Sequence, residues 1–174
     1  MKSIKHGVFV GRFCPMHLGH EAIIRKMLDE SENPVIVIGS SNNSPSMRHF
    51  FSYEERRSVI KKVFPEIPIV GLPDYSNDAA WLVALDDILR VTGADPATSV
   101  TFFGGCEEDV RFFFEAGRAC LLTNRFDGST PKISATEVRD ALIHDRSLEN
   151  LLNPAVAGDV KALFTEKWEQ FKKM

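Results

Sequence analysis

The residues best suited to chemistry lie in a decapeptide at positions 11–20, which reads GRFCPMHLGH. It contains Arg12 and two histidines three residues apart, His17 and His20. An apolar run of strand length precedes it, and an amphipathic stretch that begins at Glu21 follows it. Imidazole and guanidinium groups donate hydrogen bonds to phosphate, and the amides that open a helix attract anions. The segment therefore predicts a pocket for a polyphosphate.

The spacing of the histidines supports this prediction. If a helix begins near Leu18, a separation of three residues places both rings on one side of its first turn. Gly11 and Gly19 carry no side chain, so a phosphate can approach the backbone beside them. The alternative, two surface histidines at a helix start, leaves Arg12 and both glycines unexplained.

A zinc site is a further alternative, because Cys14, His17 and His20 form a Cys-x2-His-x2-His run. This run offers only three ligands, and His49 is the one loose candidate for a fourth. Two other phosphate-binding patterns are missing: the Walker-type loop and the Gly-x-Gly-x-x-Gly dinucleotide fingerprint.

A second group of candidate residues lies at positions 133–139, which read ISATEVR. Hydroxyls and free amides at a helix start can hold another phosphate, and Arg139 on the first or second turn can point back to it. The same spacing also fits a plain capping box between Ser134 and Glu137. Beside the histidine motif, we favour the phosphate interpretation.

Two loops complete the candidate site. The loop at 40–51 carries Arg48 and His49 and is long for a simple connection, although Arg48 could equally be a solvated charge. Trp81 stands at the head of an expected helix, after an acidic, Asn-containing loop that begins at Asp74. Its spacing alone favours a core position over a stacking platform.

Apolar segments of strand length alternate with stretches of helical period. This alternation predicts an α/β protein with a parallel sheet covered on both faces, whose carboxyl edge is where ligands bind. We expect strands at Ile4–Val10, Val35–Gly39, Ile67–Gly71, Val100–Phe103 and Ala119–Leu122, and helices at Leu18–Ser31, Tyr53–Val63, Asp78–Val91, Glu107–Ala116, Glu137–His144 and Ala155–Lys172.

Composition narrows the class of protein. A chain of 174 residues with 44% apolar and 26% charged residues fits one globular domain. A net charge of −3 predicts no general attraction to nucleic acid or to an anionic membrane. Three cysteines without paired spacing, and no signal or membrane-spanning pattern, suit a reducing cytoplasm.

The two motifs together resemble the HxGH nucleotidyltransferase superfamily, and within it the archaeal-type nicotinamide mononucleotide (NMN) adenylyltransferases. The resemblance runs through most of the chain. It rests on the decapeptide and on Ser134-x-Thr136-x-x-Arg139, with further matches at Ile38-Gly39-Ser40, Phe51-Ser52-x-x-Glu55-Arg56, Leu72-Pro73-Asp74, Ala80-Trp81, Phe103-Gly104-Gly105 and Asn153-Pro154-x-Val156.

The resemblance implies a Rossmann-like, doubly wound, five-stranded sheet. The length predicts a single domain over residues 1–174, and apolar residues at helical spacing, such as Val160 and Phe164, predict that the C-terminal helix at 154–172 docks on it. The resemblance also implies transfer of AMP from ATP to NMN, giving NAD and pyrophosphate. Mg²⁺ would be bound through the ATP phosphates, without protein side chains as metal ligands. Members of the family often assemble, so a homo-oligomer is an open expectation.

The resemblance also assigns residues to roles. The catalytic positions are Arg12, His17, His20, Arg48 and Arg139. The positions for ATP are Gly11, Arg12, Phe13, His17, Gly19, His20, Gly104, Ser134, Thr136 and Arg139. The positions for the acceptor are Ser40, Phe51, Asp74, Asp78 and Trp81. Whether Arg48 contacts ATP or the acceptor is left open.

The chain departs from the family pattern at three places. Asp78 stands where relatives carry Asn, Ala135 replaces a usual Gly, and Gly105-Cys106 replaces Asn-Pro. These departures concern the acceptor more than the transfer of the adenylyl group. Alternatives are therefore an adenylyl- or cytidylyltransferase with another acceptor, such as nicotinic acid mononucleotide, FMN or phosphopantetheine, and a nucleotide-binding regulator without turnover.

Overall fold

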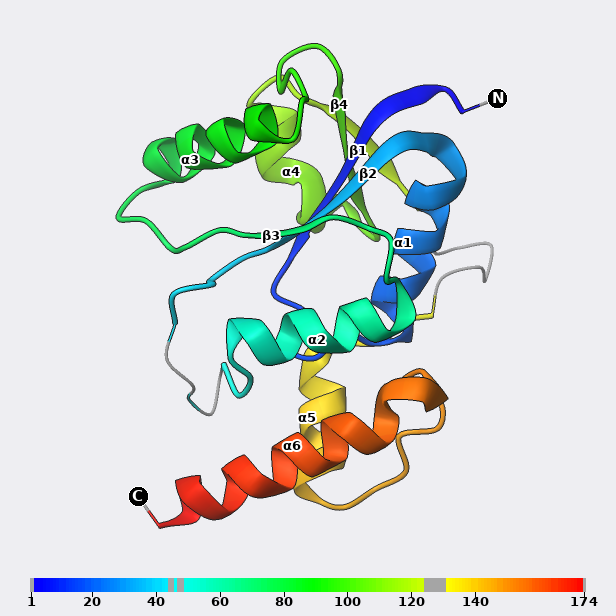
Figure 1. Ribbon diagram of the computed structural model, residues 1–174, viewed down its shortest axis with the longest axis vertical. Helices are drawn as coiled ribbons and strands as arrows, with labels where there is room; N and C mark the ends of the chain where they lie inside the picture. Colours follow the sequence, from blue (N-terminus) through cyan, green and yellow to red (C-terminus); the bar gives the residue numbers. More distant parts are fainter. Residues whose placement is uncertain (1, 44–45, 47–48, 124–130, 174) are drawn as a thin grey trace.

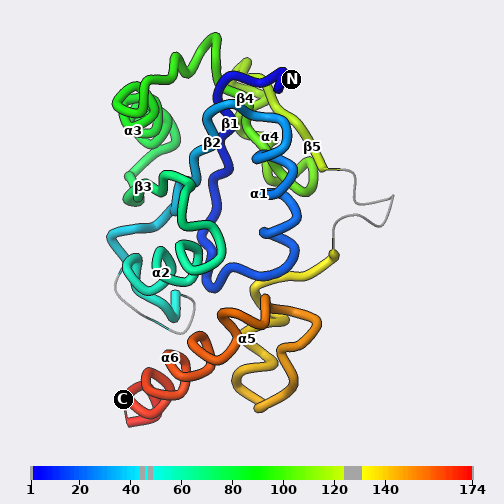
Figure 2. Tube along the Cα trace, turned by 45° about the vertical axis from the view of Figure 1, so that its right-hand side comes forward, coloured from blue at the N-terminus to red at the C-terminus, as the bar shows by residue number. Residues whose placement is uncertain are grey.

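The computed structural model describes residues 2–43, 46, 49–123 and 131–173 of the chain. This part contains a five-stranded, all-parallel sheet in the order β3-β2-β1-β4-β5 (Figures 1 and 2). The strands span Ile4–Gly11 (β1), Ser31–Ile38 (β2), Ile69–Gly71 (β3), Val100–Gly104 (β4) and Ala119–Leu122 (β5). The expected α/β class and parallel sheet are confirmed.

Helices follow the strands in the expected alternation. They span Leu18–Glu30 (α1), Tyr53–Val63 (α2), Asp78–Val91 (α3), Glu107–Glu115 (α4), Ala135–Ile143 (α5) and Pro154–Lys172 (α6). α2 and α3 have the predicted bounds. α5 begins at Ala135 rather than Glu137, because the Ser134 hydroxyl accepts from the Glu137 amide and caps the helix two residues earlier than predicted.

Two strands start at other residues than predicted. β2 begins at Ser31 rather than Val35, since its polar first residues pair with β1 through the backbone, with Ser31 opposite Ile4. Ladder hydrogen bonds do not require apolar side chains, so the apolar pattern missed this segment. β3 begins at Ile69 rather than Ile67. Ile67 is buried in the core, and the following proline has no amide to donate.

The helices cover both faces of the sheet. Neighbouring strand residues alternate between two core clusters, so that Phe9 packs on one face and Val8 on the other. The first cluster takes its helical residues from α1, α2, α5 and α6, and the second takes them from α3 and α4. This is the doubly wound arrangement expected.

α6 packs on α2, at the end of the molecule away from α3 (Figures 1 and 2). Phe164 stacks on Phe50 with ring centroids 4.5 Å apart. The ion pair between Lys167 Nζ and Glu55 Oε1, 2.6 Å long, crosses the same contact. Among the described helices, none is long and apolar enough to cross a membrane.

The strand order fixes where a ligand can bind. From β1 the chain winds outward to β2 and β3, and then returns to place β4 on the other side of β1. In open α/β sheets the crevice lies outside the carboxyl ends of the strands at this reversal. The decapeptide at 11–20 leaves β1 at that point and leads into α1.

Candidate active site

Three adjoining cavities lie at the carboxyl ends of β1 and β4. We call them the histidine cavity, of about 360 Å³ around His17 and His20, the tryptophan cavity, of about 620 Å³ beside Trp81, and the arginine cavity, of about 340 Å³ beside Arg139. Arg12 lines all three cavities. The candidate site therefore consists of three neighbouring cavities that share Arg12 as a lining residue.

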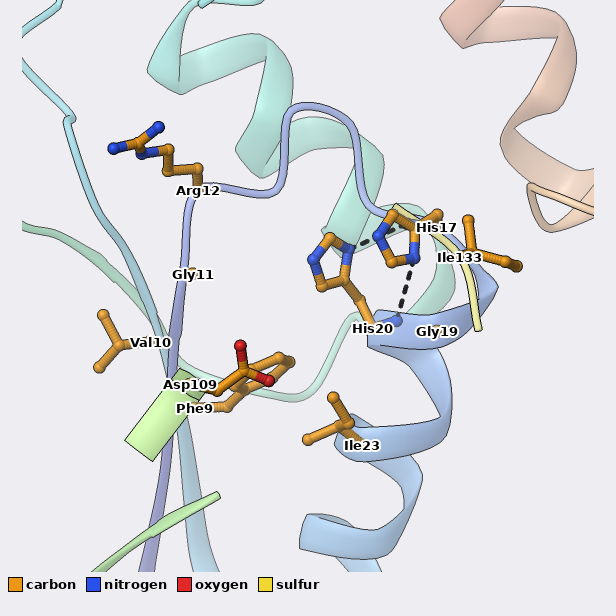
Figure 3. A pocket seen from close by; sticks show the side chains of 10 residues that line it. All are labelled: Phe9, Val10, Gly11, Arg12, His17, Gly19, His20, Ile23, Asp109 and Ile133. Atoms are coloured by element: carbon orange, nitrogen blue, oxygen red, sulfur yellow. Dashed lines mark hydrogen bonds between the residues drawn. The ribbon is translucent and has the colours of Figure 1, made fainter. Parts of the chain in front are cut away.

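The two histidines cap each other at the start of α1 (Figure 3). The His20 amide donates to His17 Nδ1 at 3.3 Å, and the His17 amide donates to His20 Nδ1 at 3.1 Å. The rings stack with centroids 3.7 Å apart. Because each Nδ1 accepts from an amide, each neutral imidazole carries its proton on Nε2. The backbone thus selects the tautomer that presents an N–H donor on the far side of each ring.

The electrostatic surroundings keep His20 neutral. Burial, and after it the charge of His17, lower the pKa of His20 well below its ordinary value of 6.5. A proton on Nδ1 would also remove the hydrogen bond from the His17 amide. A bound polyanion counteracts both effects, because it stabilises the charged ring.

Glycines make room for protein atoms at this site. A Cβ on Gly19 would lie 2.9 Å from His17 Cε1 and 3.2 Å from the Pro131 carbonyl oxygen. A Cβ on Gly104 would lie 2.8 Å from Asp109 Cβ, so this glycine lets α4 approach the end of β4. The space beside Gly19 that the sequence suggested for a phosphate is occupied by the His17 ring.

Arg12 and Asp109 stand between the histidine and tryptophan cavities and line both. In Figure 3 the Arg12 side chain points away from the two imidazoles. Asp109 Oδ2 accepts from the amides of Gly105 at 2.8 Å and Cys106 at 3.2 Å, at the start of α4. The sequence analysis did not include Asp109. Asp109 is the third residue of α4, which follows Gly104 and Gly105 at the end of β4. This position in the sequence could have marked it as a candidate.

Arg139 reaches the site from α5. Its Nη1 donates to the Cys14 carbonyl at 3.3 Å, and its Nη2 lies 3.5 Å from Thr136 Oγ1. Both residues line the arginine cavity together with Phe13 and His20. The structure therefore brings the second motif against the first, although Arg139 and His20 lie 119 positions apart in the chain.

Ser134 acts as the cap of α5. Its hydroxyl accepts from the Glu137 amide at 3.1 Å, and Glu137 Oε2 accepts from the Ser134 amide at 2.7 Å. This is the capping box that the sequence offered as the alternative. Ser134 is not among the residues that line the three cavities.

The tryptophan cavity gathers the expected acceptor residues around α3. Asp74, Asp78 and Trp81 line it, together with Phe112 and Phe113 of α4. Trp81 contacts the Phe112 ring edge-on at 5.6 Å between centroids, while its side chain remains partly exposed. Trp81 thus packs on the core and also lines a cavity. A core position and a role as a stacking platform are therefore compatible for this residue.

The other expected acceptor residues lie deeper. Ser40 is buried, and its hydroxyl donates to Asp74 Oδ1 at 2.8 Å, which holds the Asp74 side chain at the cavity rim. Phe51 is buried in the core cluster under α2 and α6. Neither lines the three cavities. Arg48 lies outside the described residues.

Arg56 on α2 is a positioning residue; the sequence analysis named it within a motif but gave it no role. The residue is 1% exposed, and its guanidinium donates to the carbonyls of Arg12 at 3.0 Å, Gly39 at 2.9 Å and Ser40 at 3.0 Å. Burial lowers its pKa from the ordinary value. Arg56 thereby ties the carboxyl ends of β1 and β2 together beneath the site.

The zinc alternative finds no support in the described residues. Among them, no group of three or more His, Cys, Asp and Glu side chains could hold a metal ion. Cys14 is buried, and both Nδ1 atoms of the histidine pair accept from amides.

Comparison with known proteins supports the interpretation that the two motifs belong to a nucleotidyltransferase. The family model described as cytidylyltransferase-like matches residues 8–141. The chain is 29% identical to a nicotinamide-nucleotide adenylyltransferase of Thermococcus sibiricus, over 90% of this chain and 83% of that protein. It is 27% identical to the enzyme of the same name from Pyrococcus furiosus, over 92% of this chain and 85% of the relative.

A solved structure shares the fold. It is a bifunctional NMN adenylyltransferase/ADP ribose pyrophosphatase from Francisella tularensis, complexed with AMP and an Mn ion. The TM-score is 0.70 at 25% identity, covering 94% of this chain and 49% of that one. The chain thus spans about half the length of that bifunctional protein. Since the family model covers most of the chain, from β1 into α5, this chain belongs to the cytidylyltransferase-like family.

Proposed function

We propose that this chain transfers AMP from ATP to NMN, releasing NAD and pyrophosphate. The observation that carries the proposal is the joining of two unlike cavities at the end of β1. One presents imidazole donors suited to phosphates, and the other presents an aromatic ring suited to a planar base. Relatives that match more than four-fifths of their length carry the name nicotinamide-nucleotide adenylyltransferase.

The reaction is an in-line attack of the acceptor phosphate on the α-phosphorus of ATP. The attacking oxygen is already ionised at neutral pH, so no protein nucleophile is required. The protein positions two polyanions and stabilises the charge that develops on the transferred group. In this proposal His17 and His20 donate from Nε2 to phosphate oxygens, and Arg12 lies between ATP and the acceptor.

The remaining ATP contacts come from the arginine cavity. Arg139 and the hydroxyl of Thr136 would hold the β- and γ-phosphates, with Phe13 beneath them. Gly11, Gly19 and Gly104 serve by letting the chain pack closely around the site. Ser134 contributes through the start of α5 rather than through its hydroxyl, which caps the helix. Arg48 remains our proposal for a further phosphate-binding cation.

The donor set fits Mg²⁺ bound mainly by the substrate. Mg²⁺ keeps several waters and commonly binds substrate phosphates with one or two carboxylates. Asp109 supplies a carboxylate at the wall of the histidine cavity, and the described residues offer no all-protein metal cage. When bound, the ion would neutralise phosphate charge, while the histidines and Arg139 orient the triphosphate.

Three broader predictions stay proposals. Packing of α6 on α2 supports a single domain over residues 1–174, with that helix docked. Cys14, Cys106 and Cys120 are free thiols, which supports a cytoplasmic location. Assembly into a homo-oligomer, and the absence of nucleic-acid and membrane partners, are expectations from the family and from the net charge.

The test is release of pyrophosphate from ATP and Mg²⁺ with a panel of acceptors: NMN, nicotinic acid mononucleotide, FMN and phosphopantetheine. We expect turnover with NMN and formation of NAD, identified by mass spectrometry. Pyrophosphate release with FMN or phosphopantetheine, and none with NMN, would overturn the assignment. ATP binding without turnover on any acceptor would favour a regulator.

A further inference from the structure

The charged side chains that line the tryptophan cavity are mostly negative. Its described lining contains three carboxylates, Asp74, Asp78 and Asp109, and a single cation, Arg12. The other lining residues are aromatic, apolar or amide side chains. A planar ring that enters this cavity therefore meets an excess of negative charge.

The three carboxylates differ in how they are held. Asp74 Oδ1 accepts from Ser40 at 2.8 Å, and Asp109 Oδ2 accepts from two backbone amides. Within the described part of the chain, no hydrogen bond or ion pair engages the Asp78 carboxylate. The neighbouring Asn77 caps α3 by accepting from the Ala80 amide at 2.8 Å, so its oxygen is already used. Asp78 is thus the carboxylate available to a ligand.

Asp78 and Trp81 are adjacent on the helix surface. They are the first and fourth residues of α3, and residues three apart lie on the same side of a helix. A ring stacked on Trp81 would therefore have the Asp78 carboxylate near its edge. An ionised carboxylate only accepts hydrogen bonds, so it favours an edge that donates.

From this arrangement we infer that the tryptophan cavity selects a pyridinium ring that bears a carboxamide over one that bears a carboxylate, with Asp78 as the specificity-determining residue. NMN carries a positive ring nitrogen and a carboxamide whose NH₂ group can donate to Asp78. Nicotinic acid mononucleotide carries a carboxylate in its place, which would face a second carboxylate. The inference rests on the proposed function, since it takes this cavity as the acceptor subsite.

The first experiment compares kcat/KM for the two mononucleotides in the wild type and in Asp78→Asn. Two charges a few ångströms apart near a protein surface predict a wild-type preference for NMN of about tenfold or more. Asp78→Asn should reduce that ratio about tenfold, mainly through the KM values of the mononucleotides. The KM for ATP should not change. Higher salt should lower the wild-type ratio and affect the variant less.

Asp87→Asn is the matched control. It removes the same charge from the same helix, at an exposed position paired with Arg90 and outside the cavity lining. It should leave the ratio unchanged. A wild-type ratio near one, or an equal shift in both variants, would overturn the inference while leaving AMP transfer intact.

A binding measurement keeps the inference testable if turnover fails. The chain has two tryptophans, so Trp168→Phe leaves Trp81 as the only indole reporter. Fluorescence titration should show tighter binding of NMN than of nicotinic acid mononucleotide, and loss of this difference in Asp78→Asn. Equal affinity, or no binding of either, would refute the inference. Absence of pyrophosphate release with either mononucleotide would instead refute the proposed function.

Discussion

At the scale of single residues, the histidine pair does two jobs with different atoms. Each Nδ1 accepts from a backbone amide and caps α1, while each Nε2 carries the proton that, in the proposed function, is donated to a phosphate. A substitution can therefore disturb the helix start, the phosphate site or both. Variants that keep a capping atom separate these contributions.

We expect His17→Ala and His20→Ala each to lower turnover by about 10²–10³-fold, the usual effect of removing one preorganised donor. Each should also cost about 1 kcal/mol of stability through the lost cap. His17→Ser restores a good capping oxygen, so it should recover stability without recovering activity. Steady-state kinetics and urea unfolding measure the two quantities.

The control for this experiment is His144→Ala, because His144 is exposed and pairs with Asp140 away from the cavities. It should leave turnover unchanged. Near-normal turnover of His20→Ala would show that the proposed role of His20 in phosphate binding is wrong.

The lowered pKa of His20 predicts a pH dependence of stability. The unfolded chain takes up a proton at His20 as pH falls below about 6.5, whereas the folded chain does not until a lower pH. The unfolded state then binds more protons, so the free energy of unfolding falls as pH drops below 6.5 and is insensitive to this group above it.

Thermal unfolding between pH 7.5 and 5.5 tests this prediction. His20→Gln keeps an acceptor at the third helical position of a capping box but has no group that titrates there, so its stability should fall less over this range. ATP should reduce the wild-type pH dependence, because phosphate stabilises the charged ring. Parallel curves for the wild type and His20→Gln would contradict the assignment.

At the scale of secondary-structure elements, the site depends on how strand ends are held. Arg56 of α2 donates to the carbonyls of Arg12, Gly39 and Ser40, which lie just beyond β1 and β2. These carbonyls have left the regular ladder, and buried acceptors without partners are costly. One buried guanidinium therefore satisfies the backbone at the place where the chain turns into the site.

Arg56→Ala should destabilise the protein by about 3 kcal/mol or more, since it leaves several carbonyls without a partner. Arg56→Lys should recover only part of this loss, because an ammonium lacks the planar fork of five donors. Arg57→Ala on the same helix is the control, because Arg57 has no hydrogen bond or ion pair among the described residues. Unfolding in guanidinium chloride measures the relative stability of these variants. Equal midpoints for Arg56→Ala and Arg57→Ala would refute the predicted role of Arg56.

At the scale of the whole molecule, the C-terminal region supports the first helix. The Leu18 amide at the start of α1 donates to the Leu151 carbonyl at 2.9 Å. Asn153, which caps α6 by accepting from the Ala155 amide, also donates to the buried Glu21 Oε1 at 2.8 Å. The first turn of α1, which carries His20, is therefore held by residues from the C-terminal part of the chain.

Asn153→Ala removes the cap of α6 and a partner of the buried Glu21. We expect a loss of about 1–3 kcal/mol in stability, with a smaller effect on turnover than that of His20→Ala. Asn33→Ala is the control, since Asn33 is exposed and makes a single hydrogen bond to the Lys5 carbonyl. Differential scanning calorimetry distinguishes the two. An unchanged transition in Asn153→Ala would show that this connection adds nothing to stability.

The sequence by itself determined the local features of this protein. The alternation of apolar and amphipathic segments predicted the α/β class, and capping residues set the start of α2. The two motifs also led to the prediction of a phosphate site, because imidazoles, a guanidinium and helix-opening amides suit anions. Asp78 and Trp81 likewise follow from helical spacing.

Only the tertiary structure decided how these pieces act together. The Arg56 contacts and the position of Asp109 between two cavities depend on segments that are distant in the chain. Sequence periodicity indicates which face of a helix or strand is buried. It does not indicate which carbonyl or aromatic ring from another part of the chain will contact that face. The charge of the tryptophan cavity arises in the same way, from three elements that the fold brings to one sheet edge.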